Sequence, residues 1–315
     1  MALSRTELES VTNDYFLLDG GKAWDQYFLS NYLINRSMKK PLKKLSGGKQ
    51  IKIPLTYDKL QGGSFSGLDT FDISRQDITN SALFDWKNYY VNVTVTFDDE
   101  TENAGPEEMV DLVVTKLENA QMTIQDDLGD DLYGDGTANG SKVLTGLLAL
   151  FNTTTTTAYG DIQQADMAKW SASVTTTSEA FTSPVIRTMR TNAKVGDGIM
   201  DKPRLIVTTD TLFDNWLNQL QAHQRMASPQ AAKAGFDGVQ LLDQAEIFSD
   251  GKCPSGYAFA LNEKHWGFVV HNRAFFARSQ WKVPTNQPYK AMQIFWKGNM
   301  VCTRRNAHNA HTNLS

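Results

Sequence analysis

The stretch from Asn88 to Thr137 reads NYYVNVTVTFDDETENAGPEEMVDLVVTKLENAQMTIQDDLGDDLYGDGT and decides the fold. Apolar and polar side chains alternate from Tyr89 to Phe97, which predicts a β-strand with one buried face. Pro106 is followed by two glutamates, a pattern typical of a helix start. Proline fits the first turn, and acidic side chains suit the positive end of the helix dipole.

The predicted helix carries one apolar stripe. Its members recur at steps of three and four: Met109, Val113, Leu117, Ala120, Ile124, Leu128 and Leu132. Gly134 ends the pattern, so a helix is expected from Glu107 to Leu132, and at roughly 40 Å it is long for a globular protein. We find no catalytic group in this stretch. A long helix between a strand and glycine-rich loops is interpreted as a scaffold, which points to a protein that assembles.

The composition is that of an ordinary globular chain. It has 315 residues, 41% of them hydrophobic and 21% charged, with a net charge of -4 that gives no global case for nucleic-acid binding. No apolar run approaches the ~20 residues of a membrane span, and the N-terminus does not resemble a secretory leader. Cys253 and Cys302 are the only cysteines, which favours a reducing compartment over a disulfide framework.

Charge is distributed unevenly along the chain. A basic segment from Arg36 to Lys52 contains no acid, and its charged residues are Arg36, Lys39, Lys40, Lys43, Lys44, Lys49 and Lys52. The region 98–131 contains one base, Lys116, among the acids Asp98, Asp99, Glu100, Glu102, Glu107, Glu108, Asp111, Glu118, Asp126, Asp127, Asp130 and Asp131. Each block can be a solvated face, but the two together suit a protein whose copies steer one another into contact.

The N-terminal third is expected to extend away from a compact body. Residues 1 to about 45 have too many aromatic and apolar side chains for a disordered tail, and we expect an arm with a short helix. Ile51, Ile53 and Leu55 predict an edge strand, whose partner is expected in the strand that ends at Phe97. The excursion between them, Tyr57–Lys87, is interpreted as a protruding two-stranded arm that needs a neighbouring subunit.

The C-terminal half predicts a small α/β layer followed by β-structure. Ser183-Pro184 opens one helix, strand 204–208 leads into a second helix capped at Thr209-Asp210, and a short strand is expected at 240–242. Further strands are expected at 257–261, 266–270 and 291–296. The threonine run 153–157 fits either an exposed edge strand or a mobile loop.

The sequence shows no convergent catalytic, cofactor or metal site. Gly47–Lys49 lacks the spacing of a phosphate-binding loop, and Gly62–Gly67 has no central serine of a nucleophile elbow. Asp130–Ser141 lacks the closing glutamate of a calcium loop and is interpreted as a structural turn. His308 and His311 are expected at the surface rather than as metal ligands, and His265 and His271 as structural histidines.

Three motifs occur in an informative order. They are Leu-Tyr-Gly-Asp-Gly-Thr at 132–137, Thr-Ala-Tyr-Gly-Asp-Ile at 157–162 followed by Trp170, and Trp-Lys-Gly-Asn-Met-Val at 296–301 with Arg304 after it. With the basic arm, the long excursion and the acidic helix, this order resembles the major capsid proteins of tailed bacteriophages. The resemblance covers nearly the whole chain and rests on the order of the pieces rather than on any one motif.

The resemblance implies an α+β chain with the Hong Kong 97-type capsid fold. Its expected parts are an N-terminal arm (1–48), an extended loop with flanking strands (49–97), a peripheral domain with the spine helix (98–180), an axial domain (181–270) and a return to the peripheral domain (271–315). A fused scaffolding segment is expected to be absent or removed.

The resemblance also implies a function. Copies would form pentamers and hexamers of an icosahedral virion shell, assembled in the host cytoplasm around double-stranded DNA, with a scaffolding protein and a portal as partners, without membrane contact and without enzyme activity. An encapsulin-like cellular shell and a monomeric α/β enzyme are the alternatives.

Candidate inter-subunit contacts fall into three groups. The extended loop contributes Lys59, Phe65, Leu68 and Phe71; the basic segment Arg36, Lys39, Lys40, Lys43 and Lys44; and the helix start Glu107, Glu108 and Asp111. Aromatic side chains dominate interface energies, so Phe65 and Phe71 are the expected anchors. Some members of the family crosslink through a lysine in this loop, but no partner for Lys59 can be named here, and no crosslink is predicted.

Overall fold

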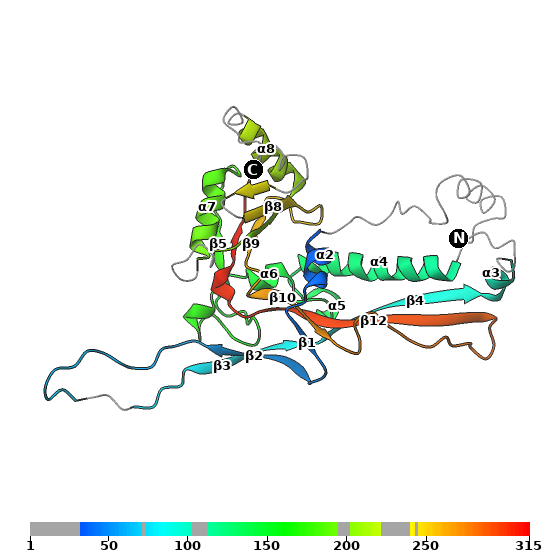
Figure 1. Cartoon of the computed structure of the whole chain (residues 1–315), viewed down its shortest axis with the longest axis horizontal. Helices are drawn as coiled ribbons and strands as arrows, with labels where there is room; N and C mark the ends of the chain where they lie inside the picture. Colours follow the sequence, from blue (N-terminus) through cyan, green and yellow to red (C-terminus); the bar gives the residue numbers. More distant parts are fainter. Residues whose placement is uncertain (1–31, 71–73, 103–111, 195–201, 222–239, 243–244) are drawn as a thin grey trace.

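A computed structural model describes residues 32–70, 74–102, 112–194, 202–221, 240–242 and 245–315. Figure 1 shows an elongated body along helix α4, an upright body that carries α7 and α8, and a loop that extends from β2 and β3 in the opposite direction to α4. The α+β class is therefore confirmed. In the part of the chain that is described, no helix is both long and apolar enough to span a bilayer.

The elongated body packs α4 (Leu112–Leu132) on a five-stranded sheet. The sheet contains β1 (Lys43–Leu45), β10 (Trp266–His271), β12 (Tyr289–Cys302), β11 (Ala277–Arg278) and β4 (Lys87–Thr96). β4 and β12 pair antiparallel over ten positions. The predicted strand and the described part of the predicted helix are thus confirmed, whereas the expected helix start at Glu107 lies outside the described residues.

The apolar stripe along α4 and the alternation of apolar and polar side chains along β4 explain why these two elements pack together. Val93 and Val95 are buried on one face of β4, and Ile124, Leu128 and Leu132 are buried on the stripe of α4. Burial of one such side chain contributes about 1.5–3 kcal/mol to folding. A short helix, α2 (Tyr32–Lys39), packs against α4, and α3 (Phe97–Glu102) follows β4 at the far end.

The base of the extended loop corrects one pairing. β2 (Gln50–Thr56) pairs antiparallel with β3 (Thr79–Asp85) over seven positions, not with the strand ending near Phe97, which is β4 and pairs with β12. Ile51 and Leu55 of β2 are buried, as are Ala82 and Phe84 of β3, so this ribbon has its own apolar face. The two-stranded arm is therefore limited to the base, since residues 57–70 and 74–78 contain no strand.

The upright body is a six-stranded sheet with α7 (Ser183–Asn192) and α8 (Asp210–Gln221) packed against it. The strand order is β5 (Ser173–Thr175), β13 (Asn309–His311), β9 (Ala258–Leu261), β6 (Leu205–Thr208), β8 (Ala245–Ser249) and β7 (Gln240–Leu242). The helices and strands predicted in this region are confirmed. Its strands β5 and β13 come from outside 181–270, and β10 from inside that range belongs to the other sheet.

Short elements connect the two bodies. They are α5 (Ala138–Ser141), α6 (Leu147–Leu150) and the 3-10 turns Ala168–Trp170 and Arg305–Ala307. The threonine run 153–157 is an exposed loop with a turn, so the edge-strand alternative is wrong. Backbone N–H and C=O groups that bond within a turn or to water at the surface do not need a partner strand.

Candidate assembly surfaces

The extended loop exposes large apolar side chains in the described part of the chain. Leu60 is 66% exposed, Phe65 67% and Leu68 102%, whereas Phe71 lies outside the described residues. Polar bonds brace the loop internally: Tyr57 Oη donates to the Asp77 carbonyl at 2.6 Å. Large exposed apolar side chains on a braced loop are typical of a contact surface. Lys59 is also exposed there.

The Thr-Ala-Tyr-Gly-Asp-Ile motif supports the base of this loop. The Leu83 amide donates to the Gly160 carbonyl at 2.9 Å, and the rings of Phe84 and Tyr159 meet edge to face at 5.3 Å. Gly160 has a φ of +62°, and a Cβ there would lie 2.9 Å from Phe84 Cζ and 3.0 Å from Ala82 Cβ. Only glycine suits both the left-handed backbone and the close approach.

The Trp-Lys-Gly-Asn-Met-Val motif places a buried amide where three segments meet. Asn299 Nδ2 donates to the Asp85 carbonyl at 2.8 Å and to Thr145 Oγ1 at 3.1 Å. Asn299 Oδ1 accepts from the amides of Met300 at 2.8 Å and Thr145 at 3.1 Å. All four hydrogen-bonding positions of the side chain are filled, which fixes β12 against the end of β3 and the loop before α6.

The Leu-Tyr-Gly-Asp-Gly-Thr motif joins α4 to the upright body. Tyr133 Oη donates to Asp250 Oδ2 at 2.9 Å. Burial raises the pKa of Asp250 above its ordinary value. Nearby, Lys252 Nζ pairs with Asp126 and with Asp130, the latter at 2.9 Å. The end of α4 is therefore tied to the loop after β8 by both a buried hydrogen bond and an ion-pair network.

Arg305 is a structural centre that the sequence analysis missed. Its guanidinium is buried and donates to the carbonyls of Leu150 and Asn152, each at 2.7 Å, and of Trp170 at 3.2 Å. It also lies 5.0 Å from the centre of the Tyr159 ring. Burial lowers the pKa of Arg305. No spacing rule identifies this role, because the hydrogen-bond acceptors of the Arg305 side chain are backbone groups from distant loops.

The basic segment divides into two parts in the structure. Arg36 is engaged within the chain: its Nε lies 2.6 Å from Glu263 Oε1 and its Nη1 contacts Glu246. The hydrogen bond with Glu263, opposed by burial, raises the pKa of Arg36. The lysines after it, Lys39, Lys40, Lys43 and Lys44, are exposed.

The acidic candidates precede the described part of α4. Glu107, Glu108 and Asp111 all lie outside the described residues. In the described part, Asp99 of α3 is already paired with Lys116 of α4 at 3.1 Å.

The prediction that the two C-terminal histidines lie at the surface is wrong. His308 and His311 are both buried, because residues 309–311 form β13 between β5 and β9. His308 Nδ1 accepts the Asn262 amide at 3.1 Å, and burial lowers the pKa of His308 to about 3. His311 Nε2 lies 2.8 Å from Glu179 Oε1.

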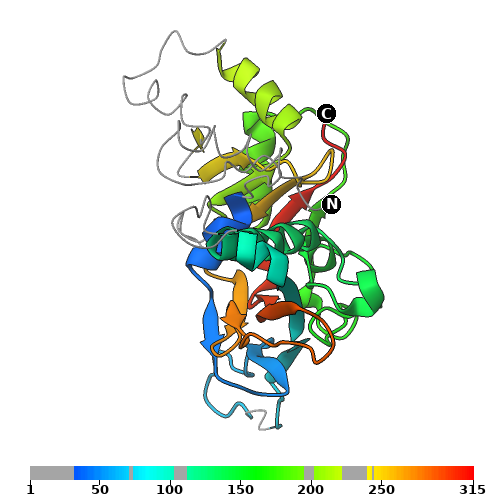
Figure 2. The ribbon, with the colours of Figure 1, turned by 90° about the vertical axis from the view of Figure 1, so that its right-hand side faces the viewer.

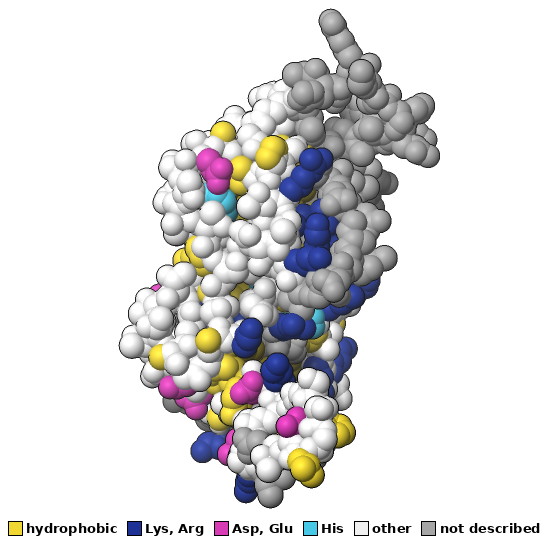
Figure 3. Space-filling view, turned by 90° about the vertical axis from the view of Figure 1, so that its left-hand side faces the viewer, with side chains coloured by type: hydrophobic (Ala, Val, Ile, Leu, Met, Phe, Trp, Pro, Cys, Tyr) yellow, Lys and Arg dark blue, Asp and Glu magenta, His cyan; other side chains and the backbone are white. Residues whose placement is uncertain are grey.

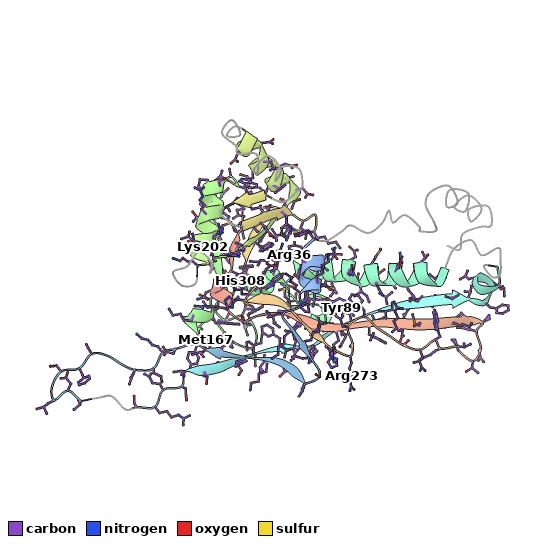
Figure 4. All side chains as sticks on the ribbon, in the orientation of Figure 1. Arg36, Tyr89, Met167, Lys202, Arg273 and His308 are labelled. Carbon is purple, nitrogen blue, oxygen red and sulfur yellow. The ribbon has the colours of Figure 1, made fainter. Side chains whose placement is uncertain are left out.

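Two buried thiols and a cavity at the base of the loop are the remaining chemical features of the described residues. Cys253 and Cys302 are buried free thiols, and burial raises the pKa of Cys302 to about 12. Among the described residues, no group of three or more His, Cys, Asp or Glu side chains is placed to hold a metal ion. A cavity of about 290 Å³ between β3 and the loops 135–160 is lined by Asp85, Lys87, Asp135, Asn152 and Tyr159 among others. Figure 4 shows how the side chains radiate from both bodies.

Comparison with known proteins identifies the fold. No protein-family model matches the chain, and no curated protein matches its sequence. Solved structures do match. The capsid of cyanophage A-1(L) covers 95% of this chain and 98% of its own, with a TM-score of 0.68 at 15% identity. The capsid of the Myoviridae phage XM1 covers 100% and 99%, with a TM-score of 0.62 at 11% identity.

An encapsulin is similar as well. The encapsulin of the holo-SrpI complex from Synechococcus elongatus PCC 7942 covers 100% of this chain and 97% of its own, with a TM-score of 0.60 at 10% identity. At such identities the likeness shows the fold alone. The chain has the Hong Kong 97-type fold that tailed-phage capsid proteins adopt, as the resemblance implied, and an encapsulin shares this architecture.

Proposed function

We propose that this chain is the major capsid protein of a tailed bacteriophage and that its copies form pentamers and hexamers of an icosahedral head shell. The observation that carries the proposal is the extended loop, whose exposed Phe65 and Leu68 project from a base fixed by Gly160. Such side chains stabilise a protein only when a surface covers them, and a neighbouring copy would supply that surface.

The loop would dock on a neighbouring copy through Phe65, Leu68 and Phe71. Burial of one such side chain contributes about 1.5–3 kcal/mol, so each loop adds several kcal/mol to a shell that repeats the contact in every copy. Because one copy gives the loop and the next receives it, the contact is head-to-tail and closes into rings. Lys59 lies on the same loop and would be a contact residue there.

The shell would enclose double-stranded DNA, with a scaffolding protein and a portal as assembly partners in the host cytoplasm. In this assignment, the peripheral domain is the sheet that carries α4, and the axial domain is the six-stranded sheet. The boundaries 1–48, 49–97, 98–180, 181–270 and 271–315 stand as a proposal, with the axial sheet also taking strands at 173–175 and 309–311. The protein would have no enzyme activity.

An encapsulin-like compartment is the second candidate, because the SrpI encapsulin aligns over the full chain. The phage role is favoured by the higher TM-score of the A-1(L) capsid, 0.68 against 0.60. A monomeric enzyme is disfavoured by the loop, which such a protein would leave uncovered in water.

Sedimentation and electron microscopy of the purified protein test the proposal. We expect closed shells or capsomer rings, and particles from phage-infected cells that contain nuclease-protected DNA. Particles filled with protein cargo instead of DNA would establish the compartment role. A monomer at all salt and protein concentrations would overturn both.

A further inference from the structure

We propose that one face of the chain binds the phosphate backbone of nucleic acid without reading its sequence. The residues of this basic face are Lys39, Lys40, Lys43, Lys44, Arg273 and Lys297. The proposal rests on the proposed function, because it assigns the part of a DNA-enclosing shell that touches its contents. Arg36 of the basic segment is not part of this face, because it pairs with Glu246 and Glu263, whereas the distant Arg273 and Lys297 belong to it.

Strand pairing brings the distant residues to the basic segment. β1 runs parallel to β10, which places Lys44 beside Val270, and the Asn272 amide donates to the Leu45 carbonyl at 2.8 Å. The turn that carries Arg273 therefore lies at the end of β1. The same turn reaches β12, because the Lys297 amide donates to the Ala274 carbonyl at 2.9 Å.

Aromatic rings hold two of these cations in place. Lys44 Nζ lies 5.5 Å from the centre of the Phe275 ring, and Lys297 Nζ lies 5.8 Å from the Trp86 ring. His271 meets Trp86 edge to face at 5.6 Å, which joins the β10 turn to the second stack. A ring under an ammonium group restricts the lysine stem without neutralising its charge, so the face keeps its cations at the surface.

Within the described residues, no carboxylate pairs with any cation of the basic face, whereas Arg36, Lys116 and Lys252 each have such a partner. In Figure 2 the blue segment that holds α2 and β1 and the orange turn after β10 lie on the same side of the molecule, at the left. Figure 3 likewise shows Lys and Arg side chains gathered along one side of the view. Unpaired cations on one side of a protein are the electrostatic footprint of a polyanion site.

Nucleic acid offers this face a continuous row of phosphates, whereas the acidic helix of a second copy is partly neutralised within its own chain. Of the carboxylates of α3 and α4, Asp99 is held by Lys116, Asp126 and Asp130 by Lys252, and Asp131 by Tyr89 Oη at 2.5 Å. These four groups have partners in their own chain, whereas Asp98, Glu118 and Asp127 are exposed and form no ion pair among the described residues. Lysine is a flexible point charge, which suits contact with a phosphate backbone at any register.

The test compares two triple variants of equal charge change. The face variant is Lys43→Gln/Lys44→Gln/Arg273→Gln, and the control is Lys142→Gln/Lys169→Gln/Lys282→Gln, which removes three exposed cations elsewhere. Fluorescence anisotropy measures binding of dispersed subunits to a labelled duplex between about 50 and 200 mM salt. Each lost phosphate contact reduces the slope of log K against log salt by about 0.9, so we expect the face variant to lose about 2 to 3 and the control little.

Equal slopes for the two triples, or no duplex binding by the wild type at low salt, would overturn the proposal. So would a face variant that slows assembly of nuclease-treated, DNA-free protein as strongly as it weakens DNA binding, since the face would then contact a second copy. Lys43→Arg/Lys44→Arg should keep the wild-type slope, and thermal melting checks that every variant folds. Failure of the wild type to form shells would count against the proposed function alone, because duplex binding is measured on subunits.

Discussion

The side-chain amide of Asn299 donates a 2.8 Å hydrogen bond to the backbone carbonyl of Asp85. This bond joins the last strand of the sheet under α4 to the strand that returns from the extended loop. The loop is therefore anchored in the middle of the fold rather than at its edge. The position of the exposed loop tip depends on a fully buried polar group.

Asn299→Ala should destabilise the fold. It removes two donors and two accepted bonds, and each buried group left without a partner costs about 1–3 kcal/mol. We expect a loss of several kcal/mol in the free energy of unfolding, measured by urea denaturation of dispersed subunits. Asn92→Ala is the control, because Asn92 is exposed on β4. Equal losses for the two variants would contradict the role of Asn299.

Gly160→Ala should loosen the base of the extended loop. The new Cβ would meet Phe84 Cζ at 2.9 Å, and the backbone has a φ of +62°. Gly140→Ala is a matched control, since Gly140 has a φ of +65° but open space around it. Both variants carry the cost of a left-handed alanine, about 1–2 kcal/mol, and only Gly160→Ala adds a clash. Calorimetry should therefore show a larger decrease in Tm for Gly160→Ala, and equal decreases would refute the packing role.

Local patterns in the sequence predicted the separate elements well. The alternation around Val93 and the stripe through Ile124 and Leu128 depend on neighbours a few residues away, and the structure has both elements as expected. Pairing depends on distant segments instead. The prediction gave β2 the wrong partner, because apolar and polar side chains alternate only weakly in strand 79–85. The apolar face of this strand, which includes Phe84, is evident only in the fold.

The central polar groups could not be predicted, for a related reason. Arg305 and Asn299 bond largely to backbone atoms of distant loops, and backbone groups leave no signature in residue types. His308 and His311 were expected at the surface from their place near the chain end, but a terminal strand inside a sheet is buried. The order of the motifs along the chain identified the fold, although no single motif was specific enough to do so.

Phe65→Ser/Leu68→Ser should abolish shell formation without loss of folding. Both side chains are exposed in the subunit, 67% and 102%, so polar replacements leave its core unchanged. Velocity sedimentation should show capsomers or subunits in place of shells, with the wild-type Tm. Val283→Ser, at a residue 65% exposed outside the loop, is the control. A folding defect in the double variant would mean that the loop tip is part of the core; intact shells would refute the docking role.

Removal of His308 should change how stability depends on pH. Burial lowers the pKa of His308 from 6.5 to about 3, so between these values the unfolded chain binds more protons than the folded one. The contribution of neutral His308 to stability is therefore complete above pH 6.5 and is lost as pH falls toward 3, by up to about 1.4 kcal/mol per pH unit. His265 is the nearby group that adds to the shift.

His308→Gln keeps an acceptor for the Asn262 amide and cannot titrate, so urea unfolding at stepped pH should show a flatter decline below pH 6.5 than in the wild type. Asp250→Asn should change the pH dependence of stability in the opposite direction. Burial raises the pKa of Asp250, so the folded state binds the extra proton, and this contribution is present at low pH and lost as pH rises through the raised pKa. Removing it should steepen the loss of stability on acidification. Parallel pH profiles for the wild type and His308→Gln would show that His308 does not stay neutral in the folded protein.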